Sequence, residues 1–450
     1  MSAPEPPLLT DPPAPHAAHS AASPLWRGVA GAVLIFLATR LVVWTAAYSG
    51  ALVDLRIAQG LGPPLEQHRR QLAQIRSAPD SELAAAYRTC IGNFAPLLRW
   101  DAGHYASIAA QGYCYTRPPP DAPLAEAQSN IAFFPLYPLM GRALAPLLGV
   151  PGALVLVANA AGLVAAVLVY LGTRRRCDGP TALLAVALVF CWPPACFYSF
   201  GYAESVMLAL TAATLLLADR GAYWAAALTC ALATAARPSG VALTLVLMLA
   251  HWFAADGPRL RRALRTLAIG LVGSLGLLAY AAYLAQRFGS ALVYLDSLRS
   301  GWVPPMSGRN WLAFALLARI WDQLKYLGRT FAALPGSLIT LADPLLWNIP
   351  ATLAVLALSL WGLARAPRRF RPWLLLGPLI FLQAYVGAGW SSFGVESLGR
   401  YTMLGLPAFI VLAAWMTGKW GAAARTTLIA ALLLIEVAWA FQFGLGEWAG

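Results

Sequence analysis

The sequence predicts an all-α polytopic membrane protein with about eleven transmembrane helices and a long loop after the first one. Of its 450 residues, 59% are hydrophobic and 11% are charged, whereas soluble domains carry roughly 25% charged residues. The apolar residues form near-continuous runs of about 15–22 residues without period-two alternation, which favours helices over a β-barrel. Lipid cannot form hydrogen bonds with backbone polar groups. Helices, which form these hydrogen bonds internally, are therefore the expected spanning structure.

The elements follow in order from these runs. Residues 1–25 are rich in Pro, Ala and Ser and are expected to form a disordered tail, and residues 26–450 a single membrane domain that begins with a span near 28–48. Residues 131–148 are apolar but contain three prolines, which predicts a re-entrant or interfacial helix. Further spans are expected near 153–172, 181–199, 203–218, 222–236, 239–254, 267–285, 343–363, 372–388, 401–417 and 426–445.

The loops set the orientation. The net charge of +13 does not form one basic stripe but recurs in short clusters, near 174–176, 259–265, 365–371 and 419–425. This distribution is typical of membrane orientation signals rather than of nucleic-acid binding, so we expect no nucleic-acid partner. The basic loops, and with them the N-terminus, are assigned to the cytoplasm. The two longest loops, 51–130 and 286–342, then lie on the outer face.

The string RWDAGHY in the first outer loop places Asp101 and His104 three residues apart, on one face if the segment is helical. A carboxylate near the point where the chain re-enters the membrane can meet both a lipid and a water-side substrate. The alternative is that Asp101 caps a helix and that His104 is an ordinary interfacial side chain.

Three further charged residues lie at outer ends of predicted spans. Glu204 follows the helix-breaking Pro193 and Pro194, and is either functional or a first-turn acid that complements the helix dipole. Arg237 in AARPSG is placed to bind a phosphate or to anchor the chain at the interface. Arg400 in GRY is placed to bind a phosphate or to pair with Glu396.

Together these strings resemble the PIG-V family of mannosyltransferases, within the GT-C superfamily of membrane glycosyltransferases. The resemblance rests on RWDAGHY with the following GY, then AFFPLYP, PPACFYSFGYAES and AARPSG, with GRY at 399–401 as a looser fit. It runs from about residue 27 to 445. Residues 128–130, Gln-Ser-Asn, depart from the charged or His residue that often precedes AFFP in that family.

The resemblance implies a GT-C-like bundle that moves a sugar, expected to be mannose, from a polyprenyl-phosphate donor to a lipid, glycan or protein acceptor. The catalytic carboxylate of such enzymes lies in the first outer loop, which makes Asp101 the general base. A phosphate leaving group needs no general acid, and inversion follows from attack on the opposite face. We expect His104 and Glu204 to orient the acceptor or the base. The residues expected to bind the donor phosphate are Arg237, Arg400 and Lys325. Those expected to line the sugar site are Trp100, Trp302 and Trp311. The scheme requires no metal and no cofactor other than the lipid-linked donor.

Two other functions remain open at this stage. A transporter or lipid flippase would use intramembrane charges, of which Arg40 and Glu436 are the clearest, together with an internal repeat. A scaffold would keep the fold without catalysis. The balance of 30 Arg to 2 Lys favours a bacterial plasma membrane, with the active site on the outer face and membrane lipid as a partner. In an oxidising compartment, Cys90 and Cys114 could pair.

Overall fold

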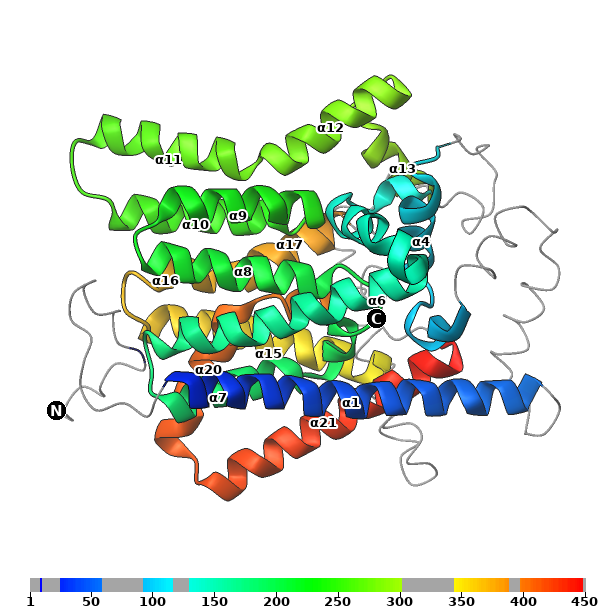
Figure 1. Ribbon diagram of the computed structural model, residues 1–450. Helices are drawn as coiled ribbons and strands as arrows, with labels where there is room; N and C mark the ends of the chain where they lie inside the picture. Colours follow the sequence, from blue (N-terminus) through cyan, green and yellow to red (C-terminus); the bar gives the residue numbers. More distant parts are fainter. Residues whose placement is uncertain are drawn as a thin grey trace, which may run out of the picture.

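A computed structural model of the protein describes Leu9 and residues 25–58, 92–115, 129–301, 344–387 and 397–447. Within these ranges every regular element is an α-helix or a 3-10 helix, and none is a strand. The long helices run roughly parallel across the molecule in stacked layers, with α1 and α21 on one side and α11 on the other (Figure 1). The predicted all-helical class is confirmed.

The first part of the chain holds α1 (Leu25–Ala58), the 3-10 helix η1 (Gly92–Leu97), α4 (Ala102–Gln111), η2 (Asn130–Ala132), α6 (Leu136–Arg174), α7 (Gly179–Phe190), η3 (Pro193–Tyr198), α8 (Glu204–Asp219), α9 (Tyr223–Ala236) and α10 (Gly240–Ala254). The second part holds α11 (Arg259–Gly273), α12 (Leu275–Phe288), α13 (Val293–Gly301), α15 (Pro344–Arg365), α16 (Arg371–Leu374), α17 (Leu376–Gly387), α19 (Leu398–Thr402), α20 (Leu406–Lys419) and α21 (Ala422–Leu445).

Four of the described helices are long and apolar enough to cross a membrane: α1, α6, α15 and α21. The bent pair α11 and α12, which meet at 51°, makes a fifth if it counts as one span, and α7, α9, α10 and α20 are shorter apolar helices. Leucines such as Leu34, Leu41 and Leu434 are 65%, 70% and 69% exposed, as expected where a helix faces lipid rather than water. The chain is therefore a multi-pass membrane protein, and the count of about eleven spans stays a prediction.

The segment predicted as a separate interfacial helix is joined to the next span. Helix α6 contains a kink at Gly149, where φ is 69° and ψ is 161°, and Pro151 follows. Only glycine adopts this backbone region readily, so the residue permits the change of direction. Residues 136–148 and the apolar residues after Gly149 are thus two helices that meet at a kink, in agreement with the helix expected before the next span. Its re-entrant or interfacial placement stays a prediction.

The basic clusters gather at one end of the bundle. The α6–α7, α10–α11, α15–α16 and α20–α21 connections all lie at the left in Figure 1, whereas α4 and α13 lie at the right. Every second loop therefore returns to the same end, as the charge pattern predicts. Which compartment each end faces stays a prediction.

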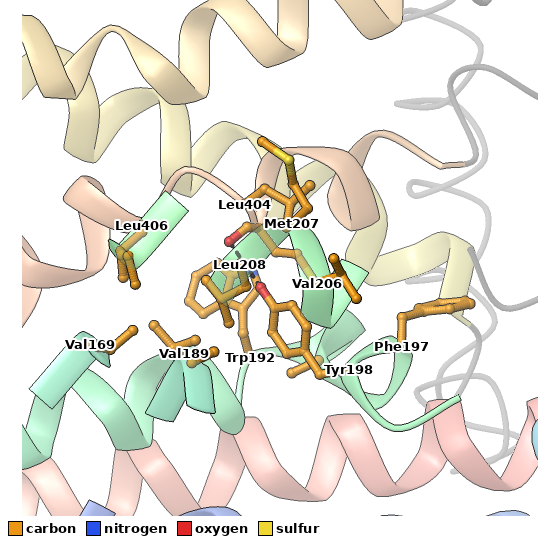
Figure 2. Close-up of a cluster of buried hydrophobic side chains, with 14 of the residues drawn as sticks. Val169, Val189, Trp192, Phe197, Tyr198, Val206, Met207, Leu208, Leu404 and Leu406 are labelled. Atoms are coloured by element: carbon orange, nitrogen blue, oxygen red, sulfur yellow. Dashed lines mark hydrogen bonds between the residues drawn. The ribbon is translucent and has the colours of Figure 1, made fainter. Parts of the chain in front are cut away.

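A cluster of buried side chains surrounds the interruption between α7 and α8. Trp192, Tyr198 and Met207 are almost fully buried there, together with Val189 and Leu404 (Figure 2). The ring of Trp192 lies edge-on to Phe409 of α20, with 5.1 Å between centroids. Pro193 and Pro194 end α7 because neither has an N–H to continue its hydrogen-bond ladder. The chain then folds through η3 and delivers Glu204 to the start of α8.

Candidate active site

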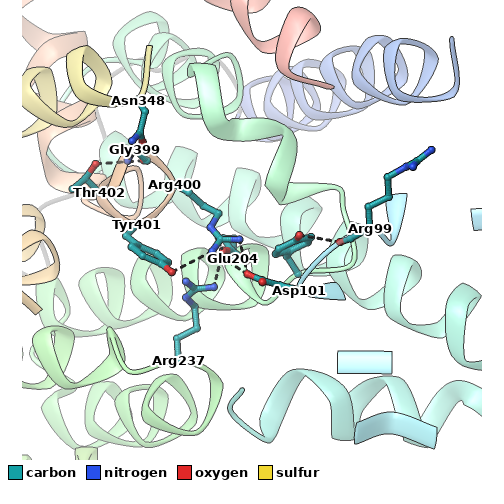
Figure 3. A network of polar contacts seen from close by, with 10 residues as sticks. Arg99, Asp101, Glu204, Arg237, Asn348, Gly399, Arg400, Tyr401 and Thr402 are labelled. Carbon is teal, nitrogen blue, oxygen red and sulfur yellow. Dashed lines mark hydrogen bonds and ion pairs between the residues drawn. The ribbon is translucent and has the colours of Figure 1, made fainter. Parts of the chain in front are cut away.

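Four charged side chains from distant parts of the sequence meet at the α4 end of the bundle (Figure 3). Asp101 Oδ2 accepts hydrogen bonds from Arg400 Nη1 and Nη2, at 3.0 and 3.1 Å. Glu204 Oε1 lies 2.6 Å from Arg237 Nη1 and 3.6 Å from Arg400 Nε. Arg400 therefore contacts both carboxylates, and the four formal charges sum to zero. We call these four residues the charge cluster.

Asp101 is placed by a strained turn. The preceding Trp100 has φ of 59°, in the left-handed region that is unfavourable for residues with a bulky side chain. The amides of Gly103 and His104 then donate to the carbonyls of Trp100 and Asp101, which starts α4. The Asp101 side chain makes no capping bond to this helix. The helix-cap alternative is therefore not what the structure shows, and the carboxylate is directed to Arg400 instead.

Glu204 is the first residue of α8, and its side chain has no exposed surface. A carboxylate at a helix N-terminus is favoured by the dipole, but that interaction alone does not offset complete burial. The two guanidinium groups beside it supply the missing compensation. Because Glu204 has no exposed surface, its position suits orientation of the arginines better than contact with an acceptor.

Arg400 lies in α19 and its side chain is 3% exposed. Its guanidinium carbon lies 5.1 Å from the Phe197 ring centroid and 5.3 Å from that of Tyr202, within the range of cation–π attraction. Burial by itself lowers the pKa of Arg400, but Tyr401, Asp101 and Glu204 raise it above its ordinary value. The group therefore remains a cation at any physiological pH.

Two glycines allow the segments that carry Arg237 and Arg400 to pack closely against neighbouring backbone. A Cβ on Gly240 would lie 2.4 Å from the backbone of Ala233 and Thr234, so the turn after Arg237 requires glycine. The amide of Gly399 donates to Asn348 Oδ1 at 2.5 Å, and a Cβ there would lie 2.7 Å from that oxygen. Close backbone packing thus fixes the segments that carry Arg237 and Arg400.

A family model described as mannosyltransferase (PIG-V) matches residues 34–289, more than half of the chain. The chain belongs to the PIG-V mannosyltransferase family. Asp101, Glu204 and Arg237 lie within the matched residues, whereas Arg400 lies beyond them.

Relatives of this PIG-V family chain include the GPI alpha-1,6-mannosyltransferase 2 proteins of several mammals. The rat protein is 30% identical over 188 residues, which are 39% of this chain and 35% of the relative. The Cricetulus griseus protein is 34% identical over 157 residues, 32% of this chain and 29% of the relative. The alignments thus span about a third of the length of these relatives.

Two solved structures show overall similarity to this family member. ArnT from Cupriavidus metallidurans, bound to undecaprenyl phosphate, has a TM-score of 0.45 and 17% identity, covering 80% of this chain and 63% of that one. The archaeal oligosaccharyltransferase AglB from Archaeoglobus fulgidus, in complex with an inhibitory peptide and a dolichol-phosphate, has a TM-score of 0.42 and 12% identity. That match covers 91% of this chain and 56% of AglB.

The remaining predicted site residues divide into two groups. His104 lies on α4 and stacks on Phe133 of the AFFP motif, with centroids 4.6 Å apart and planes at 14°. Trp100 is 40% exposed and its Nε1 donates to the carbonyl of Glu447 at 3.2 Å. Lys325, Trp302, Trp311, Glu396 and Cys90 lie outside the described residues, so their predicted roles, including the pairing of Cys90 with Cys114, stay predictions.

Sequence reasoning assigned no role to two amides that fix segments beside the candidate site. Asn348 on α15 fixes Gly399, as described above. Asn130 accepts from the Cys114 amide at 3.1 Å and donates to Gly112 O at 3.0 Å and Ser107 Oγ at 3.2 Å. The residue that departs from the family pattern thus clamps the end of α4 to η2. Only the position of Asn130 before AFFP drew attention to it, whereas Asn348 gave no signal.

Among the residues that the structure describes, His, Cys, Asp and Glu side chains form no group of three that could hold a metal ion. Asp101 and Glu204 each face a guanidinium group instead. The arrangement is suited to binding an anion, such as a phosphate, between two arginines next to a carboxylate.

Proposed function

We propose that the protein transfers mannose from a polyprenyl-phosphate donor to an acceptor hydroxyl at the outer face of the membrane. Membership of the PIG-V family supports the sugar and the reaction class. The observation that carries the mechanism is the contact of Arg400 with Asp101, because it joins an anion-binding group to a candidate base. The acceptor, whether lipid, glycan or protein, stays open.

In this proposal Asp101 takes the proton of the acceptor hydroxyl. The hydroxyl oxygen forms a bond to the anomeric carbon of the sugar, and the bond from that carbon to the phosphate oxygen breaks with inversion. The electron pair stays on the phosphate, which gains one negative charge. Because phosphate is a good leaving group, no general acid is needed. The guanidinium groups of Arg237 and Arg400 stabilise the charge as it grows.

The same contact suggests how donor binding prepares the base. Arg400 is held by Asp101 in this structure, and a donor phosphate at Arg400 competes with that carboxylate for the same N–H groups. Binding of the donor thereby frees Asp101 to accept a proton. Glu204 keeps both guanidinium groups in place during the exchange, since it contacts each of them independently of Asp101.

The expected setting is a bundle of about eleven spans in a bacterial plasma membrane, with a cytoplasmic N-terminus. We assign His104, three residues after Asp101, to the acceptor side and Trp100, directly before Asp101, to the sugar side. The proposed reaction uses the lipid-linked donor and an acceptor hydroxyl, and needs no further cofactor.

A transfer assay in membranes tests this function. Membranes containing wild type, Asp101→Asn or Asp219→Asn receive radiolabelled polyprenyl-phosphate-mannose. Asp219 is a matched control, because it is also a buried carboxylate paired with an arginine, Arg176, but is not in the charge cluster. We expect label to reach an acceptor with wild type and with Asp219→Asn, but not with Asp101→Asn. Equal transfer by Asp101→Asn would exclude it as the base, and no transfer by wild type would reject the donor.

A further inference from the structure

A second buried ion pair lies outside the charge cluster. Arg40 of α1 and Glu436 of α21 are 4% and 0% exposed, and Arg40 Nη2 lies 2.8 Å from Glu436 Oε1. Placing two charges inside a membrane protein is costly, and an apolar pair of similar size is often as stable. The pair therefore calls for an explanation beyond the attraction between its members.

Arg40 also satisfies backbone carbonyls at the interruption after α7. Its Nη1 donates to Ala195 O at 2.7 Å, and its Nη2 donates to Phe190 O. In a continuous helix the amide of residue 194 would donate to Phe190 O, but residue 194 is proline and has no N–H. Water is scarce at this depth, so the guanidinium group replaces the missing donor, and Glu436 neutralises its charge.

The residues between α7 and α8, 191–203, form what we call the break segment. It contacts three parts of the active site. The rings of Phe197 and Tyr202 lie against the Arg400 guanidinium group. Tyr202 Oη donates to Arg99 O at 3.0 Å and the Gly201 amide donates to Leu97 O at 2.8 Å, which fixes the chain just before Asp101. The segment ends directly at Glu204.

We infer that Arg40 is a positioning residue for the active site, which acts by holding the break segment through the Phe190 and Ala195 carbonyls. Glu436 is its neutralising partner. Removal of Arg40 frees the two carbonyls and loosens the segment that sets Arg400, Asp101 and Glu204 relative to one another. The catalytic consequence rests on the function proposed above, whereas the loosening itself does not.

Native cysteines provide a direct test of the loosening. Cys191 and Cys196 lie within the break segment and are 2% and 0% exposed, while Cys230 in α9 is a buried internal control. In a background with the other three cysteines changed to alanine, N-ethylmaleimide labelling is followed by mass spectrometry. For Arg40→Met we expect labelling of the two break-segment thiols to rise about tenfold or more as the segment opens locally. Labelling of Cys230 is expected to remain at the wild-type rate.

The control and the conservative variants separate this role from simple stabilisation. Arg176→Met breaks another buried ion pair, with Asp219, and is expected to leave break-segment labelling unchanged. The double variant Arg40→Met/Glu436→Leu removes both charges but leaves both carbonyls without donors, so its labelling is expected to rise. Arg40→Lys keeps the charge but has no fork to reach two carbonyls, so an intermediate rise is expected even if Arg40→Met does not fold. Wild-type labelling in folded Arg40→Lys or Arg40→Met would overturn the inference.

Binding of undecaprenyl phosphate, measured by native mass spectrometry, tests the link to the site without requiring transfer. We expect the affinity to fall about tenfold in Arg40→Met, an effect comparable to losing a hydrogen bond to a charged group, and to be unchanged in Arg176→Met. Raised labelling with unchanged affinity would refute the positioning role. If wild type transfers no mannose but these two results hold, the proposed reaction fails while the positioning role stands.

Discussion

Replacement of Asp101 by asparagine is expected to have opposite effects on transfer and on donor binding. Asparagine cannot take a proton from the acceptor, and loss of a general base lowers the rate by about 10²- to 10⁴-fold. The same change weakens the hold on Arg400, whose Nη1 and Nη2 lie 3.0 and 3.1 Å from the aspartate oxygen. The charge cluster also changes from neutral to a net charge of about +1, which favours an anionic ligand.

The gain in affinity can be sized from the bonds that are lost. Hydrogen bonds to charged groups contribute about 1.5–3 kcal/mol net. A donor phosphate that no longer competes with Asp101 recovers most of this energy, which corresponds to about 10- to 100-fold tighter binding. Purified wild type, Asp101→Asn and the control Asp219→Asn are titrated with undecaprenyl phosphate. Unchanged or weaker binding by Asp101→Asn would refute the sharing of Arg400 between base and phosphate.

Three further predictions follow from the same geometry. Arg237→Gln is expected to raise the donor KM about 10- to 100-fold, measured by transfer kinetics, with little change in the acceptor KM. A donor KM equal to that of wild type would show that Arg237 does not bind the phosphate. Glu204→Gln leaves the buried Arg237 guanidinium group without its carboxylate partner, while Arg400 keeps Asp101. It is expected to cost about 3–5 kcal/mol. In thermal unfolding in detergent the variant should be clearly less stable than Asp101→Asn, whose side chain is 13% exposed, and an equal loss would contradict this. Asn130→Ala removes three hydrogen bonds, which together contribute about 2–4 kcal/mol. It is expected to raise the rate of amide hydrogen exchange at residues 112–115. An unchanged rate would argue that Asn130 does not hold the end of α4 against η2.

Several helices could be predicted because apolar run length is a local signal, whereas the spans expected at 181–199 and 267–285 are interrupted in the structure, after Phe190 and at the bend between α11 and α12. Expected spans at 222–236 and 239–254 correspond to α9 at Tyr223–Ala236 and α10 at Gly240–Ala254. Helix α9 ends and α10 begins beside Arg237-Pro238, where the proline cannot donate a helical backbone hydrogen bond and the apolar run is interrupted. The break expected between residues 148 and 153 corresponds to the kink of α6 at Gly149, where the two helices are joined without an intervening loop.

The charged residues of the site were predictable, but their partners were not. Arg400 was expected to meet a phosphate or Glu396, and in the structure it contacts Asp101, which is 299 positions away in the chain. Arg40 and Glu436 stood out as charges within spans, yet nothing local in either helix indicates that they pair across 396 positions. An ion pair depends on which helices lie side by side, and that is decided by packing of the whole bundle.

The short helices beside the site have a consequence for membrane thickness. Helix α7 has 12 residues and α9 and α20 have 14 each, so they are about 18–21 Å long, less than the roughly 30 Å hydrocarbon core. With the basic loops anchored at one headgroup layer, their other ends stop well short of the opposite layer. We therefore expect the charge cluster to lie below the level of the surrounding headgroups, with local thinning of the bilayer around it. For the donor proposed above, this placement predicts that a phosphate carried on a membrane-embedded chain reaches the arginines by moving sideways within the leaflet, along a path that a water-soluble sugar phosphate does not share.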